Sequence, residues 1–212
     1  MASRREIAGE IATRIDAAVR AGHLPAQDTQ LTATALLGAL HEALVGPLDM
    51  VEVDLRGRKR RGRRNPTTEL DLHLRILTRR PDVGAVVHAH PPVATAFAVA
   101  GQTFGTFVLP ELILQCGQVP LVHYGTPGTP ELGDRLEPYL AGQNTWLLAN
   151  HGAVTVGPTL DAAWIRMESL EHGARIIWAA RALGQVNELT SDAVARLEGE
   201  ARRGRTPEES DA

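Results

Sequence analysis

The sequence predicts an α/β or α+β fold, in which helices and strands alternate around one buried core. Apolar runs of strand length are interspersed with segments of helical periodicity, and 212 residues are enough for one domain. Hydrophobic residues make up 43% and charged residues 22% of the chain, which is typical of a globular protein, and no apolar run is long enough to span a membrane. We expect one domain over residues 1–198 and a disordered, charged tail over 199–212.

Helical patterns dominate the N-terminal part of the chain. Residues 30–45 form an apolar helical segment, and residues 4–22 carry an aliphatic residue at every fourth position of one face, namely Ile7, Ile11, Ile15 and Val19. A further helix is expected over residues 65–80, because Thr67 and Thr68 stand where an N-cap is needed and a proline follows the last turn.

The rest of the chain continues the alternation of helices and strands. The apolar run from Val83 to His90 reads as a buried strand. The elements that follow are helices over 92–100 and 111–118, a strand that feeds a turn-rich loop within 119–133, a helix from Pro130 to about Leu140, two strands over 145–157, and a helix from about Leu160 to Leu183.

A basic run occupies Arg56 to Arg64, with seven basic residues in nine. It could bind nucleic acid or a phosphorylated partner, yet no aromatic residue interrupts it to stack on bases. The strand-like stretch VEVDLRG ahead of it favours a solvated hairpin arm instead, within about 49–64. The net charge of −3 gives no sign of a polyanion-binding protein, so nucleic acid is not expected as a partner.

Cys116 is the single cysteine, which excludes an internal disulfide and fits a reducing compartment. The N-terminal segment is too polar and acidic for a secretory signal, so we expect a cytoplasmic protein without a membrane partner. No histidine stands in an obvious base relation to Cys116, which therefore reads as a small buried hydrophobe. Any zinc site must use histidine and carboxylate ligands.

Two histidines close the predicted strand in the stretch VVHAHPP. Side chains alternate along a strand, so His88 and His90 point to the same face. A divalent cation, with zinc the leading candidate, would satisfy both rings at once, but core histidines bonded to backbone carbonyls are an equally good interpretation of this pair alone. His151 occupies the break between the last two strands, beside Gly152, and would complete a site of three nitrogen ligands with an open fourth position.

Glu69 is the candidate carboxylate for this site, because it opens the helix that leads into the histidine strand, although an acid in a first helical turn needs no further reason. His73 lies four residues later on the same helical face and either orients Glu69 or is an ordinary packed histidine. If His123 lies in a strand, the alternation of side chains aims its ring away from the site.

The chain carries, in one order, the segments TTELDLHLRILTRRPDVGAVVHAHPPVATAFAVAG, VPLVHYGTPGT and LLANHGAVTVG. Over roughly residues 48–185 it resembles the class II aldolase and adducin head domain family, and within that family the bacterial L-fuculose-phosphate aldolases. The resemblance implies a three-layer α/β/α sandwich around a central, mostly antiparallel sheet, and a cyclic homotetramer. It also implies an aldolase that cleaves or forms a carbon–carbon bond in a small sugar phosphate or related hydroxy-ketone through a metal-stabilised enediolate.

By the same resemblance His88, His90 and His151 bind zinc or another divalent metal, and Glu69 is the catalytic acid and base. Tyr124 is a proton donor that reaches a neighbouring subunit's site. Residues 23–47 are atypical, because they lack the family's Gly-Asn-x-Ser loop for the substrate phosphate. The only match to that site is the hydroxyl pair Thr67 and Thr68, and the family's C-terminal tyrosine has no counterpart after Tyr139.

Other functions remain open on the same scaffold. Epimerases of the family carry Asp at position 69, whereas dehydratases and decarboxylases use the same metal-held enolate chemistry. A non-catalytic, adducin-like module is a further alternative, although such modules lack the metal histidines that this chain retains.

Overall fold

The computed structural model describes residues 50–103 and 107–203, and of residues 201–203 the backbone alone. The elements within these ranges are β1 (Glu52–Val53), β2 (Lys59–Arg61), α2 (Leu70–Arg79), β3 (Ala85–Ala89), α3 (Pro92–Val99), α4 (Pro110–Cys116), β4 (Leu121–Val122), α5 (Pro130–Leu136), η2 (Glu137–Tyr139), β5 (Thr145–Leu148), β6 (Gly152–Gly157), α6 (Leu160–Leu183) and α7 (Ser191–Arg203). The helices expected over 4–22 and 30–45 lie outside the described residues, and the single domain over 1–198 stays a prediction.

The central sheet has four strands in the order β3-β6-β5-β4. β6 pairs antiparallel with both β3 and β5, while β4 lies parallel to β5. The predicted mostly antiparallel sheet is therefore confirmed. Because β4 and β5 run parallel, the residues that follow these two strands lie at the same end of the sheet.

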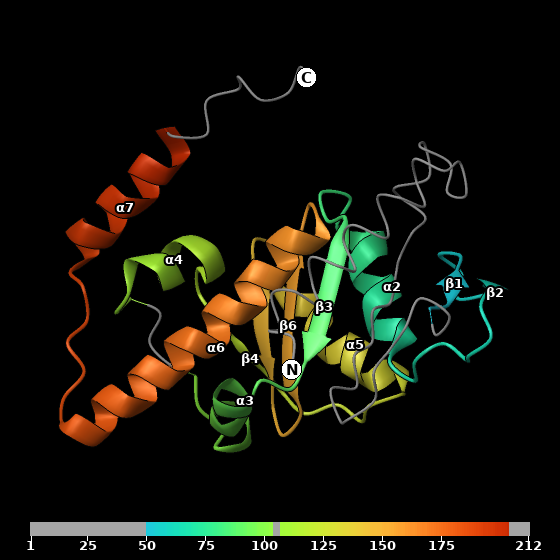
Figure 1. The fold of residues 1–212 in the computed structure, drawn as a ribbon, viewed down its shortest axis with the longest axis horizontal. Helices are drawn as coiled ribbons and strands as arrows, with labels where there is room; N and C mark the ends of the chain where they lie inside the picture. The colour runs from blue at the N-terminus through green and yellow to red at the C-terminus, as the bar shows by residue number, and fades with distance from the viewer. Residues whose placement is uncertain (1–49, 104–106, 204–212) are drawn as a thin grey trace, which may run out of the picture. The chain divides into compact units, whose positions relative to one another are not determined.

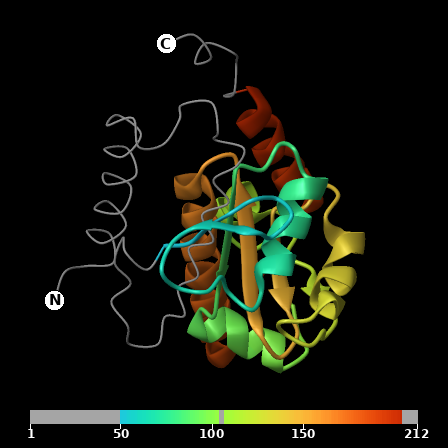
Figure 2. The same cartoon turned by 90° about the vertical axis from the view of Figure 1, so that its right-hand side faces the viewer.

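Both faces of the sheet are covered by helices (Figures 1 and 2). Side chains alternate between the two faces, so Val87 and Leu147 belong to the core formed with α3, α4 and α6, whereas Val86 and Trp146 belong to the core formed with α2 and α5. Figure 2 shows α6, in orange, on one side of the strands and α5, in yellow, on the other. This arrangement confirms the predicted three-layer α/β/α sandwich.

Local sequence explains where the helices begin. Pro92, Pro110 and Pro130 each occupy the first position of a helix, where a missing N–H costs nothing. Thr159 precedes α6, and its hydroxyl accepts a hydrogen bond from the backbone N–H of Ala162 at 3.2 Å. The long helix was predicted from Leu160 to Leu183, and the structure gives these bounds.

The basic run is a hairpin, as predicted, with β1 and β2 antiparallel. Asp54 organises its turn, because its carboxylate accepts hydrogen bonds from the amides of Arg56 and Arg58 at 2.9 and 3.0 Å and from the guanidinium groups of Arg58 and Arg60 at 2.8 and 2.9 Å. Burial alone would raise the pKa of Asp54, but these hydrogen bonds lower it to about 2. The basic side chains themselves are exposed, as expected of a solvated arm.

The C-terminal segment differs from the sequence-based expectation. α7 continues to Arg203, so residues 199–203 of the expected disordered tail are helical, and 204–212 lie outside the described residues. Alanine, arginine and glutamate, which have high helix propensity, make up most of α7. Val194 of this helix is buried, and α7 packs against α4. Low apolar content alone therefore does not predict disorder correctly for residues 199–203.

No helix within the described ranges is long and apolar enough to cross a membrane.

Candidate active site

Three histidines meet at one end of the sheet. His88 lies near the end of β3, His90 follows that strand directly, and His151 lies in the tight turn between β5 and β6. Their ring centroids are 5.0 Å (His88 to His90), 4.8 Å (His88 to His151) and 5.1 Å (His90 to His151) apart. Each ring offers one nitrogen, and the three nitrogens lie within 4.8 Å of one another. Because His88 is buried and His90 exposed, the cluster reaches from the core to the surface.

A carboxylate joins two of these rings. Glu69 Oε2 lies 2.7 Å from His88 Nε2, and its Oε1 lies 2.9 Å from His151 Nε2. On the other side of the His88 ring, Nδ1 lies 2.9 Å from the carbonyl oxygen of Ala153, which can only accept, so Nδ1 carries the proton. Nε2 of the neutral ring is then an acceptor that faces a carboxylate oxygen, and only a shared proton or a metal cation makes that contact favourable.

Glu69 immediately precedes α2 and is mostly buried, with 10% of its side chain exposed. Its backbone N–H donates to Thr67 Oγ1 at 3.0 Å, which fixes the turn ahead of the helix. The expected helix over 65–80 is shorter, Leu70–Arg79, and its N-cap is Glu69 without a side-chain capping hydrogen bond, so the predicted capping by Thr67 and Thr68 is wrong. Burial raises the pKa of Glu69, but its close contacts with the His151 and His88 rings outweigh burial and bring the pKa below its ordinary value. Glu69 is therefore ionised at neutral pH.

Gly152 leaves the space that His90 occupies. A Cβ atom at this glycine would lie 2.6 Å from the carbonyl oxygen of Ala89 and 2.8 Å from His90 Cδ2. The turn itself is tight, since Asn150 has a φ of 56° in the left-handed region. The Asn-His-Gly sequence thus bends the chain and brings the His90 and His151 rings together.

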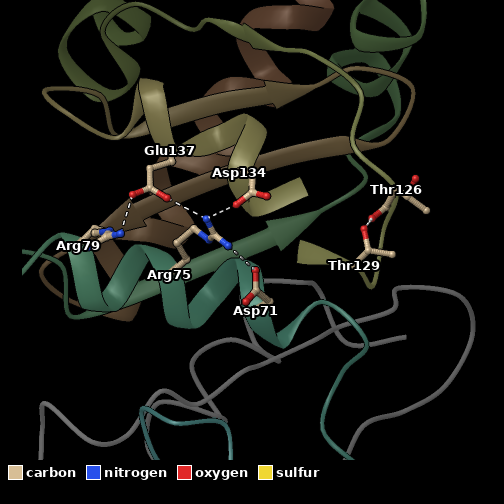
Figure 3. A network of polar contacts seen from close by, with 7 residues as sticks. All are labelled: Asp71, Arg75, Arg79, Thr126, Thr129, Asp134 and Glu137. Carbon is tan, nitrogen blue, oxygen red and sulfur yellow. Dashed lines mark hydrogen bonds and ion pairs between the residues drawn. The ribbon is translucent and has the colours of Figure 1, made fainter. Parts of the chain in front are cut away.

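A network of ion pairs holds α2 against the helices that follow β4 (Figure 3). Arg75 Nη1 donates to Asp134 Oδ1 at 2.6 Å and to Glu137 Oε2 at 2.8 Å, and its Nη2 reaches Asp71 Oδ2 at 3.4 Å. Arg79 Nη2 lies 2.8 Å from the second oxygen of Glu137. Because Glu69 begins the chain segment that these contacts fix, the network helps to set its position relative to the sheet.

His73 is buried beneath Glu69, one helical turn along α2, and only 2% of it is exposed. Burial lowers the pKa of His73 to about 4; the neighbouring His88 ring adds to this effect, and Glu69 opposes it. The ring is therefore neutral at physiological pH. The expectation that His73 orients Glu69 stays a prediction.

Tyr124 follows β4, at the same end of the sheet as His151, and is 50% exposed. The loop after it is fixed locally, because Thr126 Oγ1 donates to Glu131 Oε2 at 2.9 Å and Thr129 Oγ1 donates to the carbonyl oxygen of Thr126 at 2.7 Å. Thr68 is exposed beside this loop, since a Cβ atom at Gly128 would lie 3.3 Å from Thr68 Cβ.

Cys116 is buried, as expected of a small hydrophobe, and burial raises the pKa of its thiol to about 12. A thiol of this kind is no nucleophile at neutral pH. His123 and His172 are exposed, and the remaining histidines without a predicted role, His23 and His41, lie outside the described residues.

Glu171 is a buried charged residue that the sequence reasoning did not single out. The buried positions of α6 recur every three or four residues, and apart from Glu171 they are apolar or glycine: Ala163, Met167, Leu170, Gly173, Ala174 and Ile177. A glutamate within this repeating apolar face is the signal that could have identified it.

Comparisons with known proteins agree with this architecture. The family model for the class II aldolase and adducin N-terminal domain matches residues 10–178. The chain is 34% identical over 158 residues to the 5-methylthioribulose-1-phosphate/5-deoxyribulose-1-phosphate aldolase of Rhodospirillum rubrum, a match that covers 74% of this chain and 71% of that protein. A 3-oxo-tetronate 4-phosphate decarboxylase of Pectobacterium atrosepticum is 35% identical over 138 residues, and this match covers 62% of this chain and 62% of that protein.

A solved structure of an L-fuculose 1-phosphate aldolase has the same fold. It superposes with a TM-score of 0.69 at 28% identity, and the match covers 75% of this chain and 74% of that chain. Sequence and structure therefore agree that this chain belongs to the class II aldolase and adducin N-terminal domain family.

Proposed function

We propose that the protein is a zinc-dependent class II aldolase, which cleaves or forms a carbon–carbon bond in a small sugar phosphate or related hydroxy-ketone. The observation that carries this proposal is the contact of one carboxylate, Glu69, with two imidazoles, His88 and His151, at distances of 2.7 and 2.9 Å. An acid-base group that lies against a cluster of nitrogen ligands is the arrangement that metal-assisted enolate chemistry requires.

His88, His90 and His151 are the residues that would hold the metal. Their nitrogens are close enough to share one cation, and the hydrogen bond from His88 Nδ1 to the Ala153 carbonyl oxygen fixes the tautomer that leaves Nε2 available. Neutral imidazoles suit zinc, although other divalent metals accept them. A divalent cation held there would act as a Lewis acid and stabilise negative charge on the substrate oxygens as the carbon–carbon bond breaks.

Glu69 would carry the proton of the reaction. In cleavage it gives a proton to the enediolate carbon, and in synthesis it removes that proton. The contacts to His88 and His151 keep its pKa low, so Glu69 becomes a stronger base when substrate separates it from these rings. The ion pairs of Arg75 hold the helix that Glu69 precedes.

Tyr124 is proposed as the proton donor to the oxygen of the incoming aldehyde in synthesis; in cleavage the same oxygen gives up its hydroxyl proton to Tyr124 as the aldehyde departs. Its side chain is half exposed in the single chain, which leaves it available to the site of a neighbouring subunit in a cyclic homotetramer. Thr67 and Thr68 are proposed to lie beside the substrate phosphate, because their hydroxyls flank the start of the helix that follows Glu69. We place the enzyme in the cytoplasm.

A decarboxylase acting through the same enolate is the second candidate. It is supported by the relative from Pectobacterium atrosepticum, whose 35% identity matches that of the aldolase relatives. Decarboxylation also leaves an enolate that needs a Lewis acid and a proton, so the same residues would serve. An adducin-like module without catalysis is disfavoured by the convergence of three histidines on one point.

A substrate panel tests the proposal. The full chain, loaded with zinc, is assayed for aldehyde release and for carbon dioxide release from phosphorylated and unphosphorylated hydroxy-ketones. We expect aldehyde release, and a loss of roughly 100- to 10,000-fold in kcat for Glu69→Gln, while Glu168→Gln on an exposed face of α6 keeps full activity. Release of carbon dioxide alone would favour the decarboxylase, and unchanged activity of Glu69→Gln would contradict the role of this residue.

A further inference from the structure

Glu171 connects α6 to the start of α3. Its Oε2 accepts hydrogen bonds from the backbone N–H groups of Val93 and Ala94, both at 3.0 Å, and its Oε1 accepts from Arg175 Nε at 2.7 Å. Only 9% of Glu171 is exposed. A buried carboxylate is costly unless such donors satisfy it. Two of these donors are backbone N–H groups in the first turn of α3, which have no acceptor within their own helix.

α3 depends on this contact for its N-terminal cap. The residue that precedes it, Pro91, makes no side-chain capping hydrogen bond, and Pro92 at the first position has no N–H. Glu171 therefore supplies, from another helix, the acceptor that a serine or aspartate normally supplies from the cap position. Its negative charge also lies at the positive end of the helix dipole.

One of the three clustered histidines lies just before the capped turn. His90 lies between the end of β3, where Ala89 pairs with Ala153 of β6, and the start of α3 at Pro92. The strand fixes the chain on one side of His90, and the contacts of Glu171 fix it on the other. Pro91 and Pro92 follow His90 directly and restrict the backbone, so a shift of α3 is transmitted to the His90 ring.

We infer that Glu171 is a positioning residue for the metal site, which holds the His90 imidazole at the spacing that His88 and His151 require. This inference rests on the proposed function, since it assumes that the three histidines bind a metal. Glu171 acts through the backbone of Val93 and Ala94, and the α6 side chain thereby couples its helix to the histidine cluster at the end of the sheet.

The test compares metal binding by full-length variants. Glu171→Gln keeps the size of the side chain but removes the charge and one acceptor, and Glu168→Gln, three residues earlier on an exposed position of the same helix, is the matched control. Zinc affinity is measured by chelator competition, and the visible absorption spectrum of the cobalt-substituted protein reports the ligand geometry. We expect roughly 10- to 100-fold weaker zinc binding and an altered cobalt spectrum for Glu171→Gln, and wild-type behaviour for Glu168→Gln.

A second variant covers the case in which Glu171→Gln does not fold. Glu171→Asp keeps the charge beside Arg175 but is one methylene shorter, so it withdraws from the amides of α3, and we expect weaker zinc binding in a folded protein. If both variants only lower the unfolding temperature, with wild-type zinc affinity and cobalt spectrum, Glu171 merely stabilises α3 and the inference is wrong. A wild-type chain that binds no zinc would instead overturn the proposed function, and this inference with it.

Discussion

Replacement of Gly152 by alanine perturbs the candidate site through one methyl group. The new Cβ atom would lie 2.6 Å from the Ala89 carbonyl oxygen and 2.8 Å from His90 Cδ2, both shorter than van der Waals contact. The carbonyl oxygen belongs to β3, which is paired with β6 along its length, so the backbone cannot easily give way. Overpacking of this kind costs about 1–3 kcal/mol of stability, and we expect the His90 ring to move.

Gly157→Ala is a matched control at the opposite end of the same strand. There a Cβ atom would lie 2.7 Å from the backbone nitrogen of Ala163, so the crowding is similar but far from the histidines along β6. Chemical unfolding of the metal-free proteins, followed by circular dichroism, is expected to show a comparable loss of stability in both variants. Zinc affinity is expected to fall by roughly 10- to 100-fold in Gly152→Ala alone. Equal zinc affinity in the two variants would refute the reasoning.

Three further predictions concern buried or paired groups. The free energy of unfolding of the metal-free protein is measured at pH 8 and at pH 5. Between these pH values wild type should lose about 2 kcal/mol more of this free energy than His73→Leu loses. The pKa of His73 is about 4 in the folded chain and about 6.5 in the unfolded chain, so the folded state loses stability as the pH falls from about 6.5 toward 4. An equal dependence of stability on pH in wild type and His73→Leu would contradict this. Alkylation of Cys116 at pH 8 should require denaturant, because burial raises the pKa of its thiol to about 12. Rapid alkylation of the folded protein would contradict this. Arg75→Met should lower the free energy of unfolding by about 1 kcal/mol at low salt, and this difference should shrink in 1 M salt; a difference that 1 M salt leaves unchanged would contradict a role of the ion pairs.

Much of the fold follows from local sequence, because the strands and helices are clearly separated along the chain. The alternation in VVHAHPP predicts that His88 and His90 share a face, and the glycine after His151 predicts the break between two strands. Both follow from the geometry of a few neighbouring residues. α7 was missed, because its helix propensity was given less weight than its charge.

The site itself depends on contacts between distant segments, which spacing along the chain does not reveal. His151 reaches His88 because β6 pairs with β3. The break at Gly152 and the family resemblance both suggested that the two rings meet, but neither gives the strand pairing that brings them together. The apolar face of α6 marks Glu171 as a buried charge, but only the packing of α6 against α3 shows that it caps another element. Both examples are tertiary contacts that override a local interpretation.

The metal content of the purified full-length chain tests the central claim most directly. It is measured by elemental analysis for wild type, for His151→Ala, and for His123→Ala as a control in which an exposed histidine is removed. We predict about one equivalent of zinc or another divalent metal per chain in wild type and His123→Ala, and less than about a tenth of that in His151→Ala. A wild-type chain without bound metal, or a His151→Ala variant that keeps its full complement, would contradict the account.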